Sequence, residues 1–361
     1  MKRVQEMSIS DKVEKLLLRA EIGKALTREE IADLLRMPPA WAFELFAAAD
    51  RVRKNEVGDA VFLRGIVEFS NYCTRDCLYC GLRKSNHAIT RYRMSNDEIL
   101  HRAEYIRKTG ISTVVLQSGE DPFYSSDKVC RLIEKIRKET KLVVTLSIGE
   151  RPLEDFKAFY QAGAERYLLK HETASRALYE YLRPGCLLKS RVSCLQFIKQ
   201  LGFETGTGNM VGLPGQTFET LADDLLLMKS LNADMLGIGP FIPHPNTPLA
   251  GMENDGIDLT IRVLAMARLL TRNTNIPATT ALATLHPQGR IFALQAGANV
   301  VMPDFTPEPY RYYYNIYPGK EKIQSPEIMV REMTEELYKI GRYIDFSAGT
   351  NLNLDHRKIL H

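Results

Sequence analysis

The sequence predicts an α/β fold: a complete (β/α)8 TIM barrel with a helical extension before it and a helical segment after it. Three observations predict this fold. Short apolar runs alternate with amphipathic helical stretches along most of the 361 residues. Eight such runs are present, which suits a closed barrel of parallel strands better than an open sheet. Polar residues follow seven of them, and in a barrel such residues gather on the rim where active sites are built.

The segment from about residue 10 to 55 is predicted to be helical. Apolar residues recur at spacings of three and four in DKVEKLLLRAE, TREEIADLLRM and PAWAFELFAAADRVRKN. Thr27 precedes Glu30 at capping-box spacing, and Pro38-Pro39 separates the second helix from the third. We therefore expect three parts, namely an N-terminal extension at 1–57, the barrel at 58–323, and a C-terminal helix and tail at 324–361.

The predicted strands are short apolar runs bounded by polar or glycine-containing turns. They lie at residues 61–70, 113–119, 142–149, 166–173, 204–213, 235–242, 276–282 and 299–305. Between them, stretches such as SNDEILHRAEYIRKTG and DKVCRLIEKIRKET have one charged face. We expect these stretches to form helices that pack on the strands and expose that face to solvent.

The composition indicates a soluble globular protein, with 45% hydrophobic and 25% charged residues. The net charge of +4 arises from 48 basic and 44 acidic side chains without a sustained basic block, so nucleic acid is not an expected partner. The first residues become charged before any long apolar run, and no segment approaches about 18 uninterrupted apolar residues. We therefore expect neither a secretory signal nor a membrane span, and a cytoplasmic location.

Residues 73–81 read CTRDCLYCG, which places Cys73, Cys77 and Cys80 in a C-x3-C-x2-C array. In a cytosolic protein, such a group of cysteines more often binds metal or does redox chemistry than forms disulfides. A structural zinc site usually has four protein ligands, and no second pair with metal-binding spacing lies nearby. Three thiolates can instead hold three irons of a [4Fe-4S] cluster, which leaves the fourth iron for a small molecule. A non-catalytic iron–sulfur or zinc scaffold is the alternative.

This triplet, at the end of the first predicted strand and with Tyr79 just before its last cysteine, resembles the signature of the radical S-adenosylmethionine (radical SAM) superfamily. The resemblance implies one [4Fe-4S] cluster and S-adenosylmethionine as cofactors. In that superfamily the amino and carboxylate groups of S-adenosylmethionine chelate the open iron, and reductive cleavage yields a 5'-deoxyadenosyl radical. No cysteine follows Cys194, so a second cluster near the C-terminus is not expected.

The stretch Gln117, Ser118, Gly119 and Glu120 follows the second predicted strand. It occupies the place of the superfamily's Gly-Gly-Glu motif, whose backbone receives the methionine ammonium group. Ser118 stands where the motif has its first glycine, so the match is partial. A strand end offers carbonyl acceptors to an ammonium group, and a glycine permits close approach.

Four further residues resemble the superfamily's contacts to S-adenosylmethionine. Glu172, in KHET, resembles the acid that contacts the ribose or the ammonium group, and Arg191, in KSRVSC, resembles the partner of the carboxylate. Met210, in GNMVGLPGQ, would line the adenine site, and Tyr314 would lie near S-adenosylmethionine. The alternative for Glu172 and Arg191 is a surface ion pair.

Longer strings narrow the resemblance to one family. EFSNYCTRDCLYCGLR, VVLQSGEDP, AGAERYLLKHETA, ETGTGNMVGLPGQT, GIGPFIPHPNTPLA, NIPATTA and NVVMPDFTPEPYR are similar to HydE-type maturases of [FeFe]-hydrogenase, over roughly residues 45 to 320. The resemblance implies a role in H-cluster assembly, in which the adenosyl radical attacks the sulfur of a cysteine-bound Fe(CO)2(CN) precursor. The implied partners are a small-molecule or organometallic substrate and hydrogenase maturation proteins.

The resemblance also implies a set of residues around the substrate cavity. They are Thr145, Arg166, Lys170, Met235, Thr279, Thr280, Met302 and Tyr317. Arg166 would supply a cation for a carboxylate or cyanide-bearing anion, and the threonine hydroxyls would donate hydrogen bonds. The alternative is that these side chains fill the barrel, although an arginine inside a barrel needs an anionic partner. Lys170 stands where the family has arginine, so it keeps the charge and loses the bidentate fork.

Two related activities are the alternative enzymatic interpretations. A methylornithine synthase-like enzyme would need a cavity matched to an amino acid, which Arg166 and the threonines would also satisfy. A biotin synthase-like enzyme would need extra cluster ligands deeper in the barrel, and none is found. His244 and His286 lie in proline-containing loops and are given no catalytic role.

Overall fold

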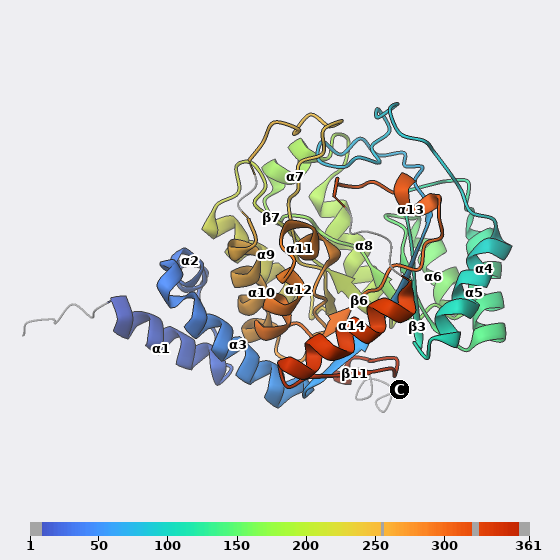
Figure 1. Ribbon diagram of the computed structural model, residues 1–361. Coiled ribbons are helices and arrows are strands. Elements are labelled where there is room, and N and C mark those ends of the chain that lie inside the picture. The colour runs from blue at the N-terminus through green and yellow to red at the C-terminus, as the bar shows by residue number, and fades with distance from the viewer. Residues whose placement is uncertain (1–8, 254–255, 320–324, 354–361) are drawn as a thin grey trace, which may run out of the picture.

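Six parallel strands form the main sheet of the computed structural model, which describes residues 9–253, 256–319 and 325–353 (Figure 1). The strands neighbour one another in the order β2 (Gly65–Ser70), β3 (Thr113–Ser118), β4 (Val143–Ser147), β5 (Arg166–Leu168), β6 (Glu204–Thr207) and β8 (Met235–Leu236). All five pairings are parallel, so all six carboxyl ends lie at one edge. The sheet therefore gathers the loops that follow its strands on one side of the molecule.

The other strands are short and form two further sheets. They are β1 (Ala60–Leu63), β7 (Met210–Val211), β9 (Gly239–Pro240), β10 (Val300–Val301) and β11 (Tyr343–Asp345). β1 lies between β10 and β11, and β7 pairs with β9. The predicted strand at 61–70 is divided at Arg64, and the predicted strands at 204–213 and 235–242 are each divided in two.

Isolated bridges connect the two edges of the six-stranded sheet. Met235 of β8 pairs with Asn275, Pro277 pairs with Val300 of β10, and Asp304 pairs with Ile66 of β2. The predicted strand at 276–282 is reduced to a single bridge at Pro277, and its last three residues belong to a helix that begins at Thr280 with Thr279 as its N-cap. The regular sheet therefore holds six strands, and within the described residues only single bridges lie between its two edge strands.

Helices follow most of the strands and cover the sheet. They are α4 (Asn96–Lys108), α5 (Ser126–Thr140), α6 (Leu153–Ala162), α7 (Arg176–Leu182), α8 (Leu188–Gln200), α9 (Phe218–Ser230), α10 (Asp258–Thr271), α11 (Thr280–Leu285), α12 (Gly289–Gln295), α13 (Tyr310–Tyr313) and α14 (Pro326–Lys339). Ser95 and Glu98 form a capping box at the start of α4, which satisfies donors that a helix start leaves unpaired. α5 buries Val129, Ile133 and Ile136, one face of a 3.6-residue period.

The core lies between the sheet and these helices, and the strands send alternate side chains to its two faces. Val67 and Phe69 of β2 belong to the apolar core, whereas Ile66 and Glu68 line a cavity on the other face. The same alternation turns Gln117 of β3 toward that cavity. Period-two alternation thus decides which strand residues can meet a ligand.

Three helices and one 3-10 turn precede β1. They are α1 (Ile9–Glu21), α2 (Arg28–Arg36), η1 (Pro39–Trp41) and α3 (Ala42–Val57). The capping box of Thr27 and Glu30 is present, as predicted. α2 packs on α9 and α3 on α10, and Arg28 forms an ion pair with Asp223 at 2.6 Å. The extension is therefore anchored on the helical layer, and its boundary at residue 57 stays a prediction.

The C-terminal segment covers the amino end of the strands. After α14, β11 lies beside β1, and the backbone then runs across the base of the sheet. The Ala348 carbonyl accepts a hydrogen bond from Arg166 at 2.8 Å, and the Gly349 carbonyl accepts one from Asn275 at 2.9 Å. Figure 1 shows β11 on the lower side of the molecule, opposite α7 and α13. The structure thus adds a strand to the predicted C-terminal helix, and residues 354–361 lie outside the described residues.

Candidate active site

The three cysteines lie in the loop after β2, at the carboxyl end of the sheet. Backbone hydrogen bonds tie this loop to three other segments: Thr74 N–H donates to the Glu120 carbonyl at 3.0 Å, Leu78 N–H to Leu182 at 2.9 Å, and Gly81 N–H to Ile316 at 2.9 Å. The loop after β3, the end of α7 and the loop after α13 therefore fix the position of the cysteine loop, as a ligand loop requires.

Two glycines permit this close packing. A Cβ atom on Gly119 would overlap the Tyr72 carbonyl oxygen and lie 2.8 Å from Cys73 Cβ. A Cβ atom on Gly81 would overlap the Asn315 carbonyl and lie 2.6 Å from the His244 ring. His244 is buried, and its Nδ1 accepts a hydrogen bond from Asn246 N–H at 3.0 Å. The His244 ring therefore packs against the cysteine loop, and its Nδ1 atom forms a hydrogen bond within its own loop.

The thiols of Cys73, Cys77 and Cys80 all line one cavity of about 240 Å³, and none forms a disulfide. Burial raises the pKa of Cys77 to about 11 and also raises the pKa of Cys73 and Cys80. Such thiols stay protonated near neutral pH unless a metal displaces the proton. Among the described residues, no three His, Cys, Asp or Glu side chains converge on a single ion. Three separated thiolates around one cavity suit a cluster in which each binds its own iron.

The structure brings most of the predicted S-adenosylmethionine contacts to this cavity. The walls include Tyr79, Gln117, Ser118, Gly119, Glu120, Glu172, Arg191 and Tyr314. Gln117 donates a hydrogen bond from Nε2 to the Tyr314 hydroxyl at 3.2 Å, so β3 and α13 meet here. Met210 lies on the adjoining cavity instead.

Three arginines and two glutamates form an ion cluster on one wall of the cysteine cavity. Glu120 pairs with Arg75, with Arg183 at 3.6 Å and with Arg191 at 3.8 Å, while Arg191 reaches Glu150 at 2.8 Å. Burial alone would lower the pKa of Arg191, but Tyr179 and the two carboxylates outweigh it, and the pKa is raised overall. The cluster has one cation more than it has anions, which suits an anionic group in the cavity.

Arg183 is a site residue that the sequence analysis missed. Its side chain is buried, donates to the Tyr79 hydroxyl at 3.2 Å and leaves Nε without a hydrogen-bond partner. The local sequence YLRPGC contains no motif that indicates a binding role for Arg183. The available signal was that Arg183 lies eight residues before Arg191, a predicted site residue.

Glu172 adopts a backbone conformation that non-glycine residues rarely adopt. Its φ is +66°, in the left-handed region, and its Oε2 atom is buried without a hydrogen-bond partner. Lys170 Nζ lies 3.6 Å from the Glu172 carboxylate. Strain of this kind tends to occur where the surroundings fix a residue for binding or catalysis.

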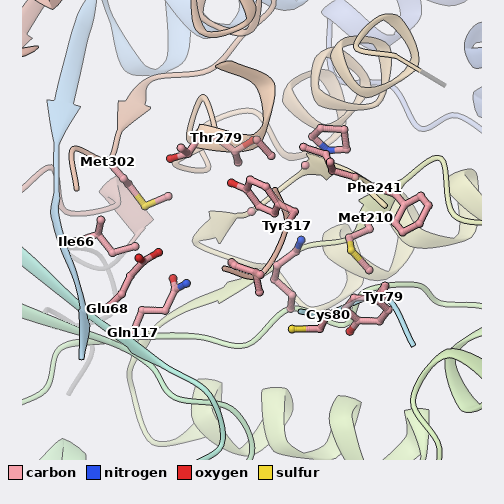
Figure 2. Close-up of a pocket in the computed structure, with 18 of the residues that line it drawn as sticks. Ile66, Glu68, Tyr79, Cys80, Gln117, Met210, Phe241, Thr279, Met302 and Tyr317 are labelled. Atoms are coloured by element: carbon pink, nitrogen blue, oxygen red, sulfur yellow. The ribbon is translucent and has the colours of Figure 1, made fainter. Parts of the chain in front are cut away.

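A second cavity of about 260 Å³ lies inside the sheet and joins the first. The two share seven lining residues, namely Tyr79, Cys80, Gln117, Leu168, Lys170, Glu172 and Ile316. Figure 2 shows Cys80 and Tyr79 at one end of this inner cavity and Thr279 and Met302 toward the other. The cysteine cavity and the inner cavity are therefore neighbours, with Cys80 on the wall of both.

The predicted substrate-cavity residues divide into two groups. Lys170, Thr279, Thr280, Met302 and Tyr317 line the inner cavity. The other three, Thr145, Arg166 and Met235, line neither cavity.

Arg166 is fully buried at the amino end of the sheet and pairs with Glu204 at 2.6 Å. The anionic partner that an arginine in this place requires is thus another residue of the chain. Thr145 lies beside Arg166 in the strand register, and the Met235 sulfur lies 2.8 Å from the Arg64 guanidinium. These three residues lie away from both described cavities, and their role in substrate binding stays a prediction.

The inner cavity also holds charged residues that the sequence analysis missed. Arg311 and Asp304 form an ion pair at 3.2 Å on its wall, and Glu68 lies nearby. Glu68 is the charged residue of GIVEFS and alternates with the apolar Val67 and Phe69. This alternation was the available signal that its side chain lies on the opposite face of the strand.

Comparison with known proteins identifies the class of this enzyme. Residues 67–228 match the family model described as the radical SAM superfamily. The match spans the cysteine loop and most residues of the outer cavity, whereas the inner cavity is also lined by residues between 237 and 317. The chain is therefore a radical SAM enzyme that uses a [4Fe-4S] cluster and S-adenosylmethionine.

The chain belongs to the HydE-type maturases within this superfamily. It is 49% identical over 298 residues to the [FeFe] hydrogenase maturase subunit HydE of Thermotoga maritima, covering 82% of this chain and 85% of that protein. A 3-methylornithine synthase of Methanosarcina acetivorans is 30% identical, over 77% of this chain and 79% of its own length. The crystal structure of methylornithine synthase (PylB) superposes with a TM-score of 0.81 at 27% identity, covering 91% of this chain and 97% of that chain.

Among the residues that the structure describes, no helix is both long enough and apolar enough to cross a membrane.

Proposed function

We propose that this enzyme acts in [FeFe]-hydrogenase maturation, on a cysteine-bound Fe(CO)2(CN) precursor of the H-cluster. The observation that supports this function most strongly is the 49% identity to the HydE subunit over 82% of the chain. The joined cavities support it as well, because a compact anionic substrate could lie in the inner cavity next to the place where S-adenosylmethionine binds.

In this proposal, Cys73, Cys77 and Cys80 hold the cluster, and the outer cavity holds S-adenosylmethionine. The cluster supplies the electron that cleaves S-adenosylmethionine to a 5'-deoxyadenosyl radical and methionine. Arg191 and Arg183 face the methionine carboxylate, because the ion cluster around Glu120 has a cation in excess. Glu172 accepts hydrogen bonds from the ribose or the ammonium group through Oε2, which has no hydrogen-bond partner and only a long ion pair with Lys170.

The inner cavity orients the substrate through the Lys170 ammonium group and several hydroxyls. Lys170 presents its ammonium group where the two cavities meet, and a point charge there attracts a carboxylate or a cyanide ligand. The Thr279 hydroxyl is buried without a hydrogen-bond partner and is free to donate to the substrate. Burial in the inner cavity keeps water from the sulfur that the radical attacks.

The finer structural and cellular assignments are part of the same proposal. The six-stranded sheet and the bridges at Asn275, Pro277 and Asp304 support a complete (β/α)8 barrel. A barrel at 58–323 flanked by the extension at 1–57 and the segment at 324–361 is the proposed division. We expect the enzyme to work in the cytoplasm with other hydrogenase maturation proteins.

The decisive experiment supplies alternative substrates to the same enzyme. Reconstituted protein is incubated anaerobically with S-adenosylmethionine, a reductant, and either the cysteine-bound Fe(CO)2(CN) complex or lysine. We expect consumption of the iron complex together with 5'-deoxyadenosine formation, followed by mass spectrometry and infrared spectroscopy of the CO and CN ligands. Turnover of lysine alone would refute the maturase function.

A methylornithine synthase activity is the second candidate. The likeness to the 3-methylornithine synthases in sequence and fold favours it. An amino acid would place its carboxylate on Lys170, so the cavity chemistry is compatible with both substrates. The lysine arm of the experiment above distinguishes the two functions, with methylornithine as the product to be detected.

A further inference from the structure

Asp224 is a fully buried carboxylate on α9, outside both cavities. It accepts hydrogen bonds from Ala174 N–H and from Asn209 Nδ2 at 2.8 Å, with Gln216 Nε2 at 3.5 Å. Within the described residues, no lysine or arginine lies at ion-pair distance from it, and His171 Nε2 approaches to 3.8 Å. Burying a carboxylate without a cation is costly, so these hydrogen bonds must hold it.

The donors to Asp224 belong to the two segments that carry Glu172 and Met210. Ala174 follows Glu172 by two residues, and Asn209 directly precedes Met210. The segments are also joined to each other, since Met210 N–H donates to the Glu172 carbonyl at 3.0 Å. Gln216 extends the same network, because its Nε2 donates to the Met210 carbonyl at 2.9 Å. Asp224 therefore connects the ends of β5 and β6.

The network also explains how the left-handed conformation of Glu172 persists. This conformation costs a non-glycine residue roughly 1–2 kcal/mol and survives only where neighbouring contacts determine it. On one side, Glu172 N–H donates to the Gly208 carbonyl at 3.0 Å. On the other side, Ala174 N–H is fixed by Asp224, which is held in turn by the helix α9.

We propose that Asp224 is a positioning residue that sets Glu172 and Met210 at the separation that bound S-adenosylmethionine requires. The proposal rests on the roles proposed above for these two residues. Asp224 touches neither cavity, so it acts on the cofactor only through the β5 and β6 ends.

The test measures S-adenosylmethionine affinity by anaerobic calorimetry on the cluster-loaded enzyme, with iron content and melting temperature recorded for each variant. Asp224→Asn keeps the shape of the side chain but replaces one carboxylate oxygen with an NH2 group. This donor would then face the Nδ2 donor of Asn209, so the hydrogen bond between the two residues is lost. We expect Kd for S-adenosylmethionine to rise at least tenfold and KM to rise more than kcat falls, with unchanged iron content.

A swap of the two groups provides the rescue. In the double variant N209D/D224N, the new amide at position 224 would donate to the new carboxylate at position 209, so a donor again faces an acceptor. We expect Kd within about threefold of the wild-type value, because two residues in direct contact compensate each other in a double-mutant cycle. Asp223→Asn is the matched control on the same helix, because Asp223 pairs with Arg28 far from the cavities and its loss should leave Kd unchanged. Asn209→Ala removes one donor and serves if Asp224→Asn does not fold.

Two results would overturn the positioning role. One is a lowered melting temperature in Asp224→Asn with an unchanged Kd for S-adenosylmethionine. If Asp224→Asn does not fold, the same result in Asn209→Ala counts instead. The other is a swap that restores the melting temperature and leaves Kd high. Failure of the wild-type enzyme to bind S-adenosylmethionine would instead refute the proposed cofactor contacts, so the two failures are distinguishable.

Discussion

The two ends of the sheet carry similar ion clusters in opposite surroundings. At the amino end, Arg64 and Arg166 share Glu204, at 3.5 and 2.6 Å. At the carboxyl end, three arginines share Glu120 and Glu150. Each cluster has one arginine more than it has carboxylates. The amino-end cluster is covered by backbone carbonyls of Ala348 and Gly349, whereas the carboxyl-end cluster faces a cavity.

This difference teaches that charge alone does not distinguish a structural cluster from a binding site. A carbonyl oxygen of the chain's own C-terminal segment satisfies the excess cation at one end. At the other end, tyrosine hydroxyls accept from Arg183 and Arg191, and the cluster also borders a cavity that an anionic group could enter. Substitutions at the amino end should therefore change stability, and substitutions at the carboxyl end should change cluster and cofactor binding.

The largest effect is expected at the carboxyl end, from Cys77→Ala. It removes one of three cluster ligands, so both the bound cluster and 5'-deoxyadenosine formation should be lost. Iron analysis and the EPR spectrum of the reduced protein measure the first effect, and chromatography measures the second. Cys130→Ala, outside the cavity, is the control and should retain both. Persistence of either signal in Cys77→Ala would contradict the ligand assignment.

At the amino end, Glu204→Gln should cost roughly 3–5 kcal/mol of unfolding free energy, because it leaves Arg166 buried without a counter-charge. Chemical denaturation monitored by circular dichroism measures the loss. S-adenosylmethionine affinity of the folded fraction should be unchanged. A large affinity change with little loss of stability would instead assign Arg166 to ligand binding.

Two glycines offer a matched pair of smaller substitutions. Gly119→Ala should displace Cys73 and lower the bound iron, because the new methyl group overlaps the Tyr72 carbonyl. Gly349→Ala should destabilise the protein without loss of iron, because Gly349 has φ of +58° and its Cβ would overlap the Phe62 ring. Each should cost roughly 1–3 kcal/mol of stability. Equal iron loss in both variants would argue against the separation of the two ends.

The smallest effect concerns acid stability at the carboxyl end. Burial raises the pKa of Asp121, but hydrogen bonds from Arg93 and Ser70 outweigh burial and lower it overall from 3.8. A depressed carboxyl pKa contributes stability that is present above the ordinary pKa and is lost as the pH falls below it. Denaturation between pH 5 and roughly pH 2 should therefore show a steeper loss of stability in the wild type than in Asp121→Asn. Parallel curves would show that the pair of Asp121 and Arg93 contributes nothing to stability at acid pH.

Much of the fold and of the outer cavity could be predicted from the sequence. Alternating apolar runs located the strands of the main sheet, and the residues after β3 and β5, such as Glu120 and Glu172, do line the cavity with the three cysteines. These signals are local: a strand period, a motif, and the rule that strand ends gather at one edge.

The amino end could not be predicted, because its contacts join residues far apart in the chain. Arg166 requires an anion on physical grounds, but no pattern shows that Glu204 supplies it or that Ala348 lies beneath it. The start of α11 within the predicted strand at 276–282 is of the same kind, since an apolar run fits a short strand and a buried helix equally well. Arg183 escaped notice because its role depends on where Glu120 lies in space.

The position of β11 has a consequence for biosynthesis. The strands of the main sheet lie within residues 65–236, whereas residues 343–351, which cover its amino end, are made later. A nascent chain that stops before β11 would expose β1 as an open edge and leave Arg166 without the Ala348 carbonyl. The base of the sheet is thus covered only after residues 343–351 have been made, and the parallel pairing of β11 with β1 spans about 280 residues of chain, the kind of distant contact that slows folding.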